Sequence, residues 1–279
     1  MVYIIIAAVP TALFALFVFA VMTRRKMKDA MTPFEERLIA HRGLHTPDAP
    51  ENSLAAFKRA KDAGYGIELD VQLTSDGRLA VFHDETLKRM CGVDKKLSEL
   101  TLSELEKLPL GDTDCKIPLF EEVLRLIDGR VPMVIEIKSY GNALDVCRVL
   151  AGYLDGYGGD FCIESFDPFA LRWFRKNRPS YVRGQLAKNY LREGTLITFP
   201  VRLALTYLFA DVIGRPDFIA YNHKNRKTLA MRFLKRTGSA KFAAWTVRSE
   251  KELSLAKKFY DIIIFDSFVP GEDTTENKK

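Results

Sequence analysis

Three carboxylates and a lysine occupy alternate positions in two short apolar segments. Glu68 and Asp70 are two residues apart in IELDV, and Glu136 and Lys138 have the same spacing in VIEIK. Side chains two apart on a β-strand point to the same face. Alternating polar residues usually mark the solvent-exposed face of a half-buried strand. Carboxylates that are buried, however, need a cationic partner or a metal ion. Three carboxylates brought together would offer the oxygen ligands that Mg²⁺ or Ca²⁺ prefers and zinc does not.

Two of the four histidines end apolar segments of the same kind. His41 closes LIAH and is followed by Arg42 and Gly43, where glycine permits a sharp turn, and His83 closes LAVFH. A single histidine at a strand end is more often structural, so its position alone is weak evidence. Together with the carboxylates, two histidines could transfer protons, while Arg42 and Lys138 could bind an anion such as phosphate. This combination indicates metal-assisted phosphoryl transfer.

These residues can meet only if their segments are neighbouring strands of one sheet. From residue 37 onward, short apolar segments alternate with longer helical ones, which predicts an α/β fold with a parallel sheet. The number of units and the absence of a glycine-rich dinucleotide motif favour a (β/α)8 TIM-type barrel, whose active site lies at the carboxyl ends of the strands. The predicted strands are 38–41, 66–73, 79–83, 132–138, 161–165, 181–186, 217–221, 241–247 and 261–266, and the predicted helices are 52–62, 100–107, 119–127, 143–154, 168–177, 225–237 and 249–260.

Nine strand candidates exceed the eight places of a barrel, so one of them must lie outside it. We expect the extra strand to be DFIAY (217–221) or YVRGQL (181–186). The domain organisation follows from the same pattern. We expect an amino-terminal segment 1–23, a basic linker 24–36, the barrel 37–268 and a disordered tail 269–279.

Several of these segments resemble the motifs of the glycerophosphodiester phosphodiesterases. The resemblance is carried by LIAHRG (38–43), APENSLAAF (49–57), GIELDVQLTSDGRLAVFHDETLKR (66–89), KIPLFEEVL (116–124) and VIEIK (134–138), and more weakly by ESFDPFALRWFRKNRP (164–179) and AAWTV (243–247). It implies a (β/α) barrel that hydrolyses glycerophosphodiesters to glycerol 3-phosphate and an alcohol. It also implies one divalent cation, Mg²⁺ or Ca²⁺, as the cofactor.

The resemblance assigns roles to the residues that match the family motifs. His41 and His83 match an acid–base pair, and Glu68, Asp70 and Glu136 match metal ligands. One histidine would take the proton of the attacking 2-hydroxyl or water and the other would protonate the departing alkoxide. Which histidine does which is left open, as is a cyclic-phosphate intermediate against direct attack by water. The residues expected to bind or orient the substrate are Arg42, Lys138, Trp245 and Glu51.

The chain departs from the family pattern at two late positions. Arg248 follows the W-T-V run, where the family often has Asn, and Phe265 precedes Asp266, where the family often has Thr. Both positions lie late in the barrel, away from the histidines and carboxylates, so they bear on substrate preference and not on the reaction type. The remaining histidines, His45 and His223, are expected to have no catalytic role.

The amino-terminal segment differs in composition from the barrel. Val2–Met22 is 21 residues without a charged side chain, about the length that crosses a bilayer. A buried core helix would carry a polar face, and a cleavable signal peptide would carry its positive charge before the apolar stretch. Here the charge follows it, in Arg24, Arg25, Lys26 and Lys28. This order predicts a retained single-pass anchor in the cell membrane, with the barrel in the cytoplasm.

The remaining composition excludes some partners and indicates a compartment. The four basic residues after the anchor, against Asp29, supply +3 of the net charge of +6, so the barrel is nearly balanced and nucleic-acid binding is not indicated. The four cysteines show no paired C-x-x-C spacing, which favours free thiols in a reducing compartment. Nothing in the sequence indicates an oligomeric state.

A second apolar segment, Thr195–Ile213, carries only Arg202 and Asp211 as charged residues. A membrane span here would prevent the barrel from closing, so we expect either a buried barrel helix or an interfacial helix on the bilayer beside the mouth. The leading hypothesis is a membrane-anchored phosphodiesterase for water-soluble diesters such as glycerophosphocholine or glycerophosphoethanolamine. The alternatives are the same chemistry on lysophospholipids or other lipid-tailed diesters, and a catalytically silent, membrane-tethered lipid-binding module.

Overall fold

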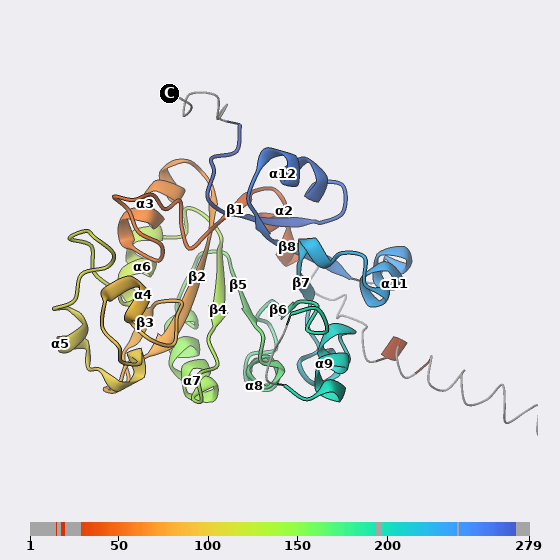
Figure 1. The fold of residues 1–279 in the computed structure, drawn as a ribbon, viewed down its shortest axis with the longest axis horizontal. Helices are drawn as coiled ribbons and strands as arrows, with labels where there is room; N and C mark the ends of the chain where they lie inside the picture. The colour runs from red at the N-terminus through yellow and green to blue at the C-terminus, as the bar shows by residue number, and fades with distance from the viewer. Residues whose placement is uncertain (1–14, 16–17, 20–28, 194–196, 239, 272–279) are drawn as a thin grey trace, which may run out of the picture.

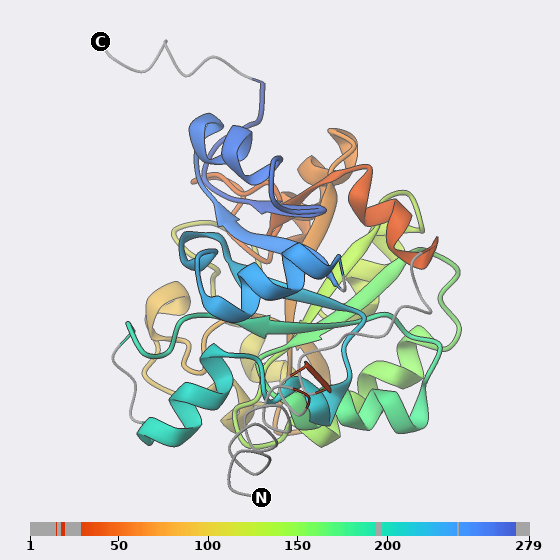
Figure 2. The same ribbon diagram turned by 90° about the vertical axis from the view of Figure 1, so that its right-hand side faces the viewer.

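The computed structural model describes residues 15, 18–19, 29–193, 197–238 and 240–271 (Figure 1). Eight parallel strands close into a barrel, which confirms the predicted (β/α) barrel. Figures 1 and 2 show the strands and the helices around them from two directions. Around the barrel the strands are β1 (Leu38–His41), β2 (Gly66–Leu73), β4 (Met133–Ile137), β5 (Phe161–Ser165), β6 (Arg183–Ala187), β7 (Phe218–Asn222), β8 (Lys241–Val247) and β9 (Ile262–Phe265), which pairs with β1.

The register of the strands brings polar residues of their carboxyl ends level with one another. His41 on β1 is the partner of Glu68 on β2, and Asp70 on β2 is the partner of Glu136 on β4. Glu136 is in turn the partner of Glu164 on β5. Because neighbouring parallel strands hold these residues at matched heights, their side chains meet at one end of the barrel.

The ninth strand, β3 (Leu79–Val81), pairs antiparallel with β2 and lies outside the parallel barrel. The expectation that DFIAY or YVRGQL is the extra strand is therefore wrong, because these segments form β7 and β6. The reason is the length of the connection between β2 and β3, which is only TSDGR (74–78). A parallel crossover needs about a dozen residues or more, whereas a short turn containing Asp-Gly makes a hairpin.

The chain between β3 and β4 forms a small lobe beside the barrel. It contains α4 (Lys88–Cys91), η2 (Leu97–Glu99) and α5 (Leu102–Leu105), so the helix predicted over 100–107 is a single turn. The lobe has its own buried cluster, to which Phe82, Leu87, Leu97, Leu100, Leu105 and Leu110 belong.

Amphipathic helices cover the outside of the barrel in chain order (Figure 1). Several begin at a side chain that accepts a hydrogen bond from the first turn, which compensates for the unpaired N–H groups there. Ser53, Asp167 and Ser249 have this role. The helices are α3 (Leu54–Asp62), α6 (Phe120–Ile127), α7 (Ala143–Leu154), α8 (Pro168–Asn177), α9 (Phe199–Thr206), α10 (Asp211–Gly214), α11 (Leu229–Thr237) and α12 (Glu250–Ala256).

The amino end of the barrel is filled by the segment that precedes β1. In it, η1 (Asp29–Met31) and α2 (Thr32–Glu35) bury Met31 and Phe34, each only 1% exposed. Both side chains therefore extend the apolar core across this end, although their segment is the one predicted as a linker. They belong to one cluster with side chains from the strands, among them Ile39, Val134, Cys162, Phe218 and Ile262.

The apolar segment 195–213 is not one continuous helix, because α9 and α10 are separated by a turn. Phe199, Val201 and Leu203 are 40–65% exposed, so α9 is not a buried barrel helix, whereas Thr206, Leu208 and Asp211 in the second half of the segment are buried. Whether the exposed face meets a bilayer remains a prediction.

The predicted anchor, residues 1–23, lies almost entirely outside the described residues, and so does the tail from residue 272. Among the helices that the structure describes, none combines the length and the apolar character needed to span a membrane. Phe19 is one of the few described residues of the anchor segment. Its ring centroid lies 4.0 Å from the guanidinium of Arg215, which also donates a hydrogen bond of 2.6 Å to the Phe19 carbonyl.

Candidate active site

A cavity of about 220 Å³ opens at the carboxyl ends of the strands, and we call it the catalytic cavity. One side is formed by residues at the carboxyl ends of β1, β2 and β4 and by His83, two residues after β3. The opposite side is formed by residues at or just after the carboxyl ends of β5, β7 and β8. The predicted site residues in its wall are His41, Arg42, Glu68, His83, Glu136, Lys138 and Trp245, joined by Glu164, Phe166, Asn222, Lys224, Thr246 and Arg248.

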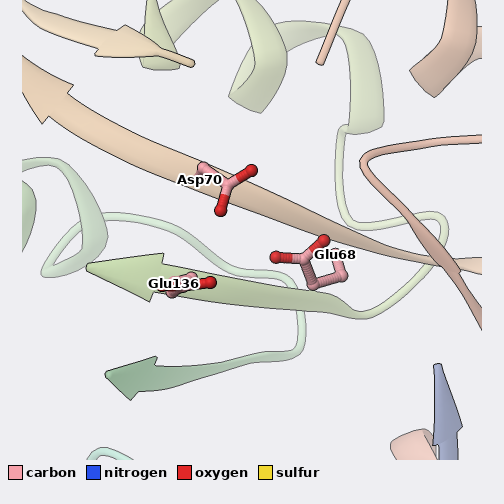
Figure 3. Close-up of side chains that lie close together, drawn as sticks. All are labelled: Glu68, Asp70 and Glu136. Carbon is pink, nitrogen blue, oxygen red and sulfur yellow. The ribbon is translucent and has the colours of Figure 1, made fainter. Parts of the chain in front are cut away.

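Glu68, Asp70 and Glu136 form an acidic cluster in this part of the barrel. Figure 3 shows Glu68 and Asp70 extending from β2 toward Glu136 on β4. One oxygen of each carboxylate lies within 4.8 Å of the others, and the side chains are almost fully buried. Oxygen ligands of Ca²⁺ lie about 2.3–2.6 Å from the ion, so the ligands of one ion are at most about 5 Å apart. Both the spacing and the ligand type therefore fit a hard divalent cation.

Two cations lie against the cluster. The Nζ atom of Lys138 is 2.9 Å from Oδ1 of Asp70 and 2.8 Å from Oε1 of Glu136, and Arg42 Nε is 3.5 Å from Oδ2 of Asp70. Asn52 also donates a hydrogen bond of 2.8 Å to Oδ2 of Asp70. Burial acts to raise the pKa of Asp70, but Lys138 and Arg42 outweigh it and hold that pKa below its usual range.

The other two carboxylates are not compensated to the same degree. Burial, with repulsion from Asp70 and Glu136, raises the pKa of Glu68. Burial also raises the pKa of Glu136, to about 7, against the opposing effect of Lys138. When all three carboxylates are ionised, their negative charge exceeds the positive charge of Lys138 and Arg42, and a divalent cation bound between them would compensate for the excess.

His41 lies between two carboxylates at the end of β1. Its Nδ1 is 3.4 Å from Oδ2 of Asp266, and its Nε2 is 3.9 Å from Oε2 of Glu68. Burial lowers the pKa of His41 although Asp266 acts in the opposite direction. The imidazole is therefore mostly neutral at pH 7, the form that can accept a proton.

Asp266 follows β9 and connects His41 to three further residues. Its Oδ1 lies 2.7 Å from Nε2 of His45 and accepts a hydrogen bond from Ser267, and its Oδ2 accepts one of 3.0 Å from Arg248. Burial acts to raise the pKa of Asp266, but the interactions with His41 and His45 outweigh it, so the carboxylate stays ionised. His45, for which we expected no catalytic role, thus helps to hold the partner of His41.

His83 is oriented by a separate pair of residues. Its Nδ1 lies 2.6 Å from Oδ1 of Asp84, and Asp84 accepts a hydrogen bond of 2.6 Å from Arg89. Tyr140 donates a hydrogen bond to the backbone carbonyl of His83. Burial lowers the pKa of His83, with Lys138 acting in the same direction against Asp70. Each histidine in the wall of the cavity thus has its own carboxylate.

The HRG and PEN motifs form one turn around the acidic cluster. Arg42 adopts φ 56°, and its backbone N–H donates a hydrogen bond of 3.0 Å to Oε2 of Glu68. Gly43 has φ 82°, and a Cβ there would lie 2.8 Å from the backbone of Ala56, so no other residue fits. Glu51 accepts hydrogen bonds from Arg42 and Arg89 and lies outside the wall of the catalytic cavity. It therefore orients Arg42.

The opposite side of the cavity combines an aromatic wall with two cations. Trp245 donates its Nε1 hydrogen to the carbonyl of Ala220 at 2.8 Å and meets the ring of Phe166 edge to face. Lys224 and Arg248 lie beyond this wall at the ends of β7 and β8. The acidic cluster therefore lies on one side of the cavity, and two cations, Lys224 and the Asp266-paired Arg248, lie on the other.

Several polar residues of the site were not predicted from the sequence, among them Asn52, Asp84, Glu164 and Asp266. Glu164 is 2% exposed, and burial together with Glu136 raises its pKa. Glu164 and Asp266 stand at the ends of apolar strands, as do the predicted residues, so the same rule applied to every strand would have found them. Asn52 and Asp84 lie in loops, and only their contacts distinguish them.

The chain is similar in sequence to known proteins of one family. The model of the glycerophosphoryl diester phosphodiesterase family matches residues 41–268. The chain is 38% identical over 162 residues to a glycerophosphodiester phosphodiesterase of Caldanaerobacter subterraneus subsp. tengcongensis, covering 53% of this chain and 65% of that one. It is 42% identical over 112 residues to a glycerophosphodiester phosphodiesterase of Bacillus altitudinis, covering 37% of this chain and 44% of that one. The chain thus spans less than two thirds of each of these relatives.

Solved structures share the barrel. An Oleispira antarctica phosphodiesterase in complex with the product sn-glycerol-3-phosphate superposes with a TM-score of 0.68 at 23% identity, covering 82% of this chain and 92% of that one. A glycerophosphodiester phosphodiesterase of Thermotoga maritima superposes with a TM-score of 0.64 at 25% identity, covering 82% of this chain and 93% of that one.

Proposed function

Because this chain belongs to the glycerophosphoryl diester phosphodiesterase family, we propose that it hydrolyses glycerophosphodiesters to glycerol 3-phosphate and an alcohol. The observation that carries the proposal is the convergence of two histidines, three carboxylates and two cations on one cavity. We place water-soluble diesters first among the substrates. Relatives that carry the name of this activity support that choice over lipid-tailed diesters.

The acidic cluster is the proposed site for one divalent cation, Mg²⁺ or Ca²⁺, held by Glu68, Asp70 and Glu136. When bound, such a cation supplies positive charge for the oxygens of the phosphodiester. Arg42 and Lys138 lie beside the cluster and would bind the remaining phosphate oxygens. Trp245 would contact the glycerol or the alcohol portion, since it forms the wall opposite the cluster.

His41 and His83 are the proposed acid–base pair. One of them takes a proton from the attacking oxygen, either the 2-hydroxyl of the glycerol or a water molecule, as the new P–O bond forms. The other gives a proton to the alcohol oxygen as its P–O bond breaks. Asp266 and Asp84 lie against Nδ1 of the two rings and would keep them oriented for these transfers. The order of the two roles is not assigned.

The proposal for the cell membrane rests on the uncharged segment 2–22 and the basic residues after it. We propose a single-pass anchor with the barrel in the cytoplasm. A reporter fused to the carboxyl terminus tests the orientation. A reporter that is active only in the cytoplasm would agree, and one active only outside the cell would contradict it.

A substrate panel on the full chain tests the reaction. We expect release of glycerol 3-phosphate from glycerophosphocholine or glycerophosphoethanolamine, loss of that release in chelator, and its return with Mg²⁺ or Ca²⁺. The Glu136→Gln variant should need much more added cation than the wild type, which direct cation titration by calorimetry can measure without turnover. Hydrolysis that is unaffected by both chelator and His41→Ala would contradict the site assignment.

A further inference from the structure

A second cavity, of about 380 Å³, lies next to the catalytic cavity between the segments that carry α9 and α11. Figure 1 shows these two helices on the same side of the barrel, next to β6 and β7. Three cations line it, Arg192, Lys224 and Lys227, and no carboxylate is among the residues that line it. None of the three cations forms an ion pair with a carboxylate in the part of the chain that the structure describes. We call it the cationic cavity.

Hydrogen-bond donors in the cationic cavity are also left without partners. Thr206 is 1% exposed and lines the cavity, and its Oγ1 has no hydrogen-bond partner among the described residues. A buried hydroxyl without a partner is unfavourable, so this group is suited to a polar ligand. The first turn of α11 also begins here, and the side chain of Thr228 does not cap it. Its backbone N–H groups add to the positive potential.

Lys224 connects the two cavities. It lines the catalytic cavity on the side of β7 and also lines the cationic cavity. Arg248 lies on the same side of the catalytic cavity, at the position where the sequence departs from the family pattern. Because Arg248 is paired with Asp266, Lys224 is the residue that extends positive charge from the catalytic cavity into the cationic cavity.

We propose that the cationic cavity binds an anionic group on the alcohol portion of the diester. The proposal rests on the proposed function for the reaction itself and names its substrate class: glycerophosphodiesters whose alcohol carries a second phosphate or a carboxylate. The scissile phosphate already has Arg42 and Lys138 beside the acidic cluster. The second set of cations therefore has no role toward that phosphate and is placed for a charge further along the alcohol.

Turnover of a matched pair of substrates tests the proposal. Glycerophosphoinositol and glycerophosphoinositol 4-phosphate differ by one phosphate on the alcohol. We expect the wild type to prefer the phosphorylated substrate by about tenfold in kcat/KM, a preference that weakens as KCl is raised. The R192Q/K227Q double variant should reduce the ratio of the two kcat/KM values to near one. The K176Q/K257Q double variant removes the same charge from exposed positions of other helices and should keep the wild-type ratio.

The outcomes separate the two proposals. Equal kcat/KM values in the wild type, or a preference that survives in R192Q/K227Q, would overturn the proposed role of the cationic cavity. Neither result would contradict the proposed reaction. If neither these substrates nor glycerophosphocholine were hydrolysed, the proposed function would fail, and calorimetry with inositol 4-phosphate would still test binding to the cationic cavity. Binding that is lost in R192Q/K227Q and kept in K176Q/K257Q supports the cavity, and the absence of binding to the wild type overturns it.

Discussion

The amino and carboxyl ends of the barrel are built from the same eight strands but are filled in opposite ways. At the amino end, Met31 and Phe34 pack against apolar side chains of the strands. The buried guanidinium of Arg183 there lies 3.7 Å from Asp217 and donates a hydrogen bond to a backbone carbonyl. At the carboxyl end, buried carboxylates gather with raised pKa values, as in Glu68 and Glu164.

The residues that stabilise the fold and the residues that would act on a substrate therefore lie at opposite ends of the barrel. Burial of a large apolar side chain contributes about 1.5–3 kcal/mol, whereas a buried charge without full compensation is destabilising. The residues that stabilise the barrel can therefore lie at one end, and the residues at the other end can be selected for the charge they present to a phosphate. Substitutions at the two ends should separate activity from the free energy of unfolding.

The largest expected effect is the loss of activity in His41→Ala. Removing one member of an acid–base pair lowers kcat/KM by about 10³-fold, within the usual range for such catalysis. The melting temperature should change by only a few degrees, because His41 belongs to the end that contributes little to stability. His223→Gln is the matched control, since His223 is buried at the same end but lies outside the wall of the catalytic cavity. An H41A enzyme within tenfold of the wild type would contradict the assignment.

The opposite pattern is expected for Phe34→Ala at the amino end. Truncation of a fully buried phenylalanine costs about 3–5 kcal/mol in the free energy of unfolding, because it removes apolar contacts and leaves a cavity. Urea unfolding measures this loss, and kcat at a temperature where the variant is folded should stay within about twofold of the wild type. Phe169→Ala, at a position 54% exposed on α8, should change stability by less than about 0.5 kcal/mol. A parallel loss of kcat in F34A would show that the two ends are coupled.

Many site residues at the carboxyl end of the barrel could be predicted because the sequence patterns that indicate them are local. Glu68 with Asp70, and Glu136 with Lys138, show the alternation of a strand within five residues, and the barrel brings the ends of strands together. The extra strand was misplaced because apolar runs alone do not show how two strands pair. The short TSDGR connection carried that information.

Contacts that close the barrel could not be predicted in the same way. His41 on β1 meets Asp266 after β9 only because the first and last strands pair, and the two residues are far apart in the chain. His45 lies in the loop after HRG and was expected to have no catalytic role, and no local pattern shows that it reaches the same distant carboxylate. The burial of Phe34 likewise depends on the open amino end of a finished barrel, which no local pattern shows.

Asp266→Asn tests this long-range contact and should have an intermediate effect. A residue that orients a reacting group typically contributes about 10- to 100-fold, so kcat should fall by that factor. Because Asp266 raises the pKa of His41 against the effect of burial, its replacement should lower that pKa further. The limb of the pH–rate profile that belongs to His41 should therefore move to lower pH.

The matched control for D266N is Ser267→Ala, which removes another partner of Asp266 and leaves the contact with His41 in place. It should retain most of the activity and the wild-type pH profile. A D266N enzyme that loses activity without a shift of the profile would reduce Asp266 to a structural role. Unchanged activity in D266N would show that Asp266 has no role in the active site.

The smallest expected effect is a pH-dependent gain of stability in Glu164→Gln, measured in chelator. Burial, with repulsion from Glu136 and Asp70, raises the pKa of Glu164 above its unfolded value, so the folded state binds the proton more tightly. The associated stability is present below the unfolded pKa and is lost as pH rises through the folded pKa. Glutamine does not ionise, so E164Q should gain about 1 kcal/mol over the wild type at pH 8 and much less at pH 4.5.

Melting temperatures at the two pH values measure this gain, with Glu106→Gln at an exposed position as the control that should show none. Phe34→Ala removes only apolar contacts, so its loss of stability should be similar at pH 4.5 and pH 8. If E164Q gave the same difference from the wild type at both pH values, ionisation would not be the source of the cost at the carboxyl end. A gain confined to high pH would locate that cost in the ionised Glu164, which lies beside the three carboxylates proposed to hold a divalent cation.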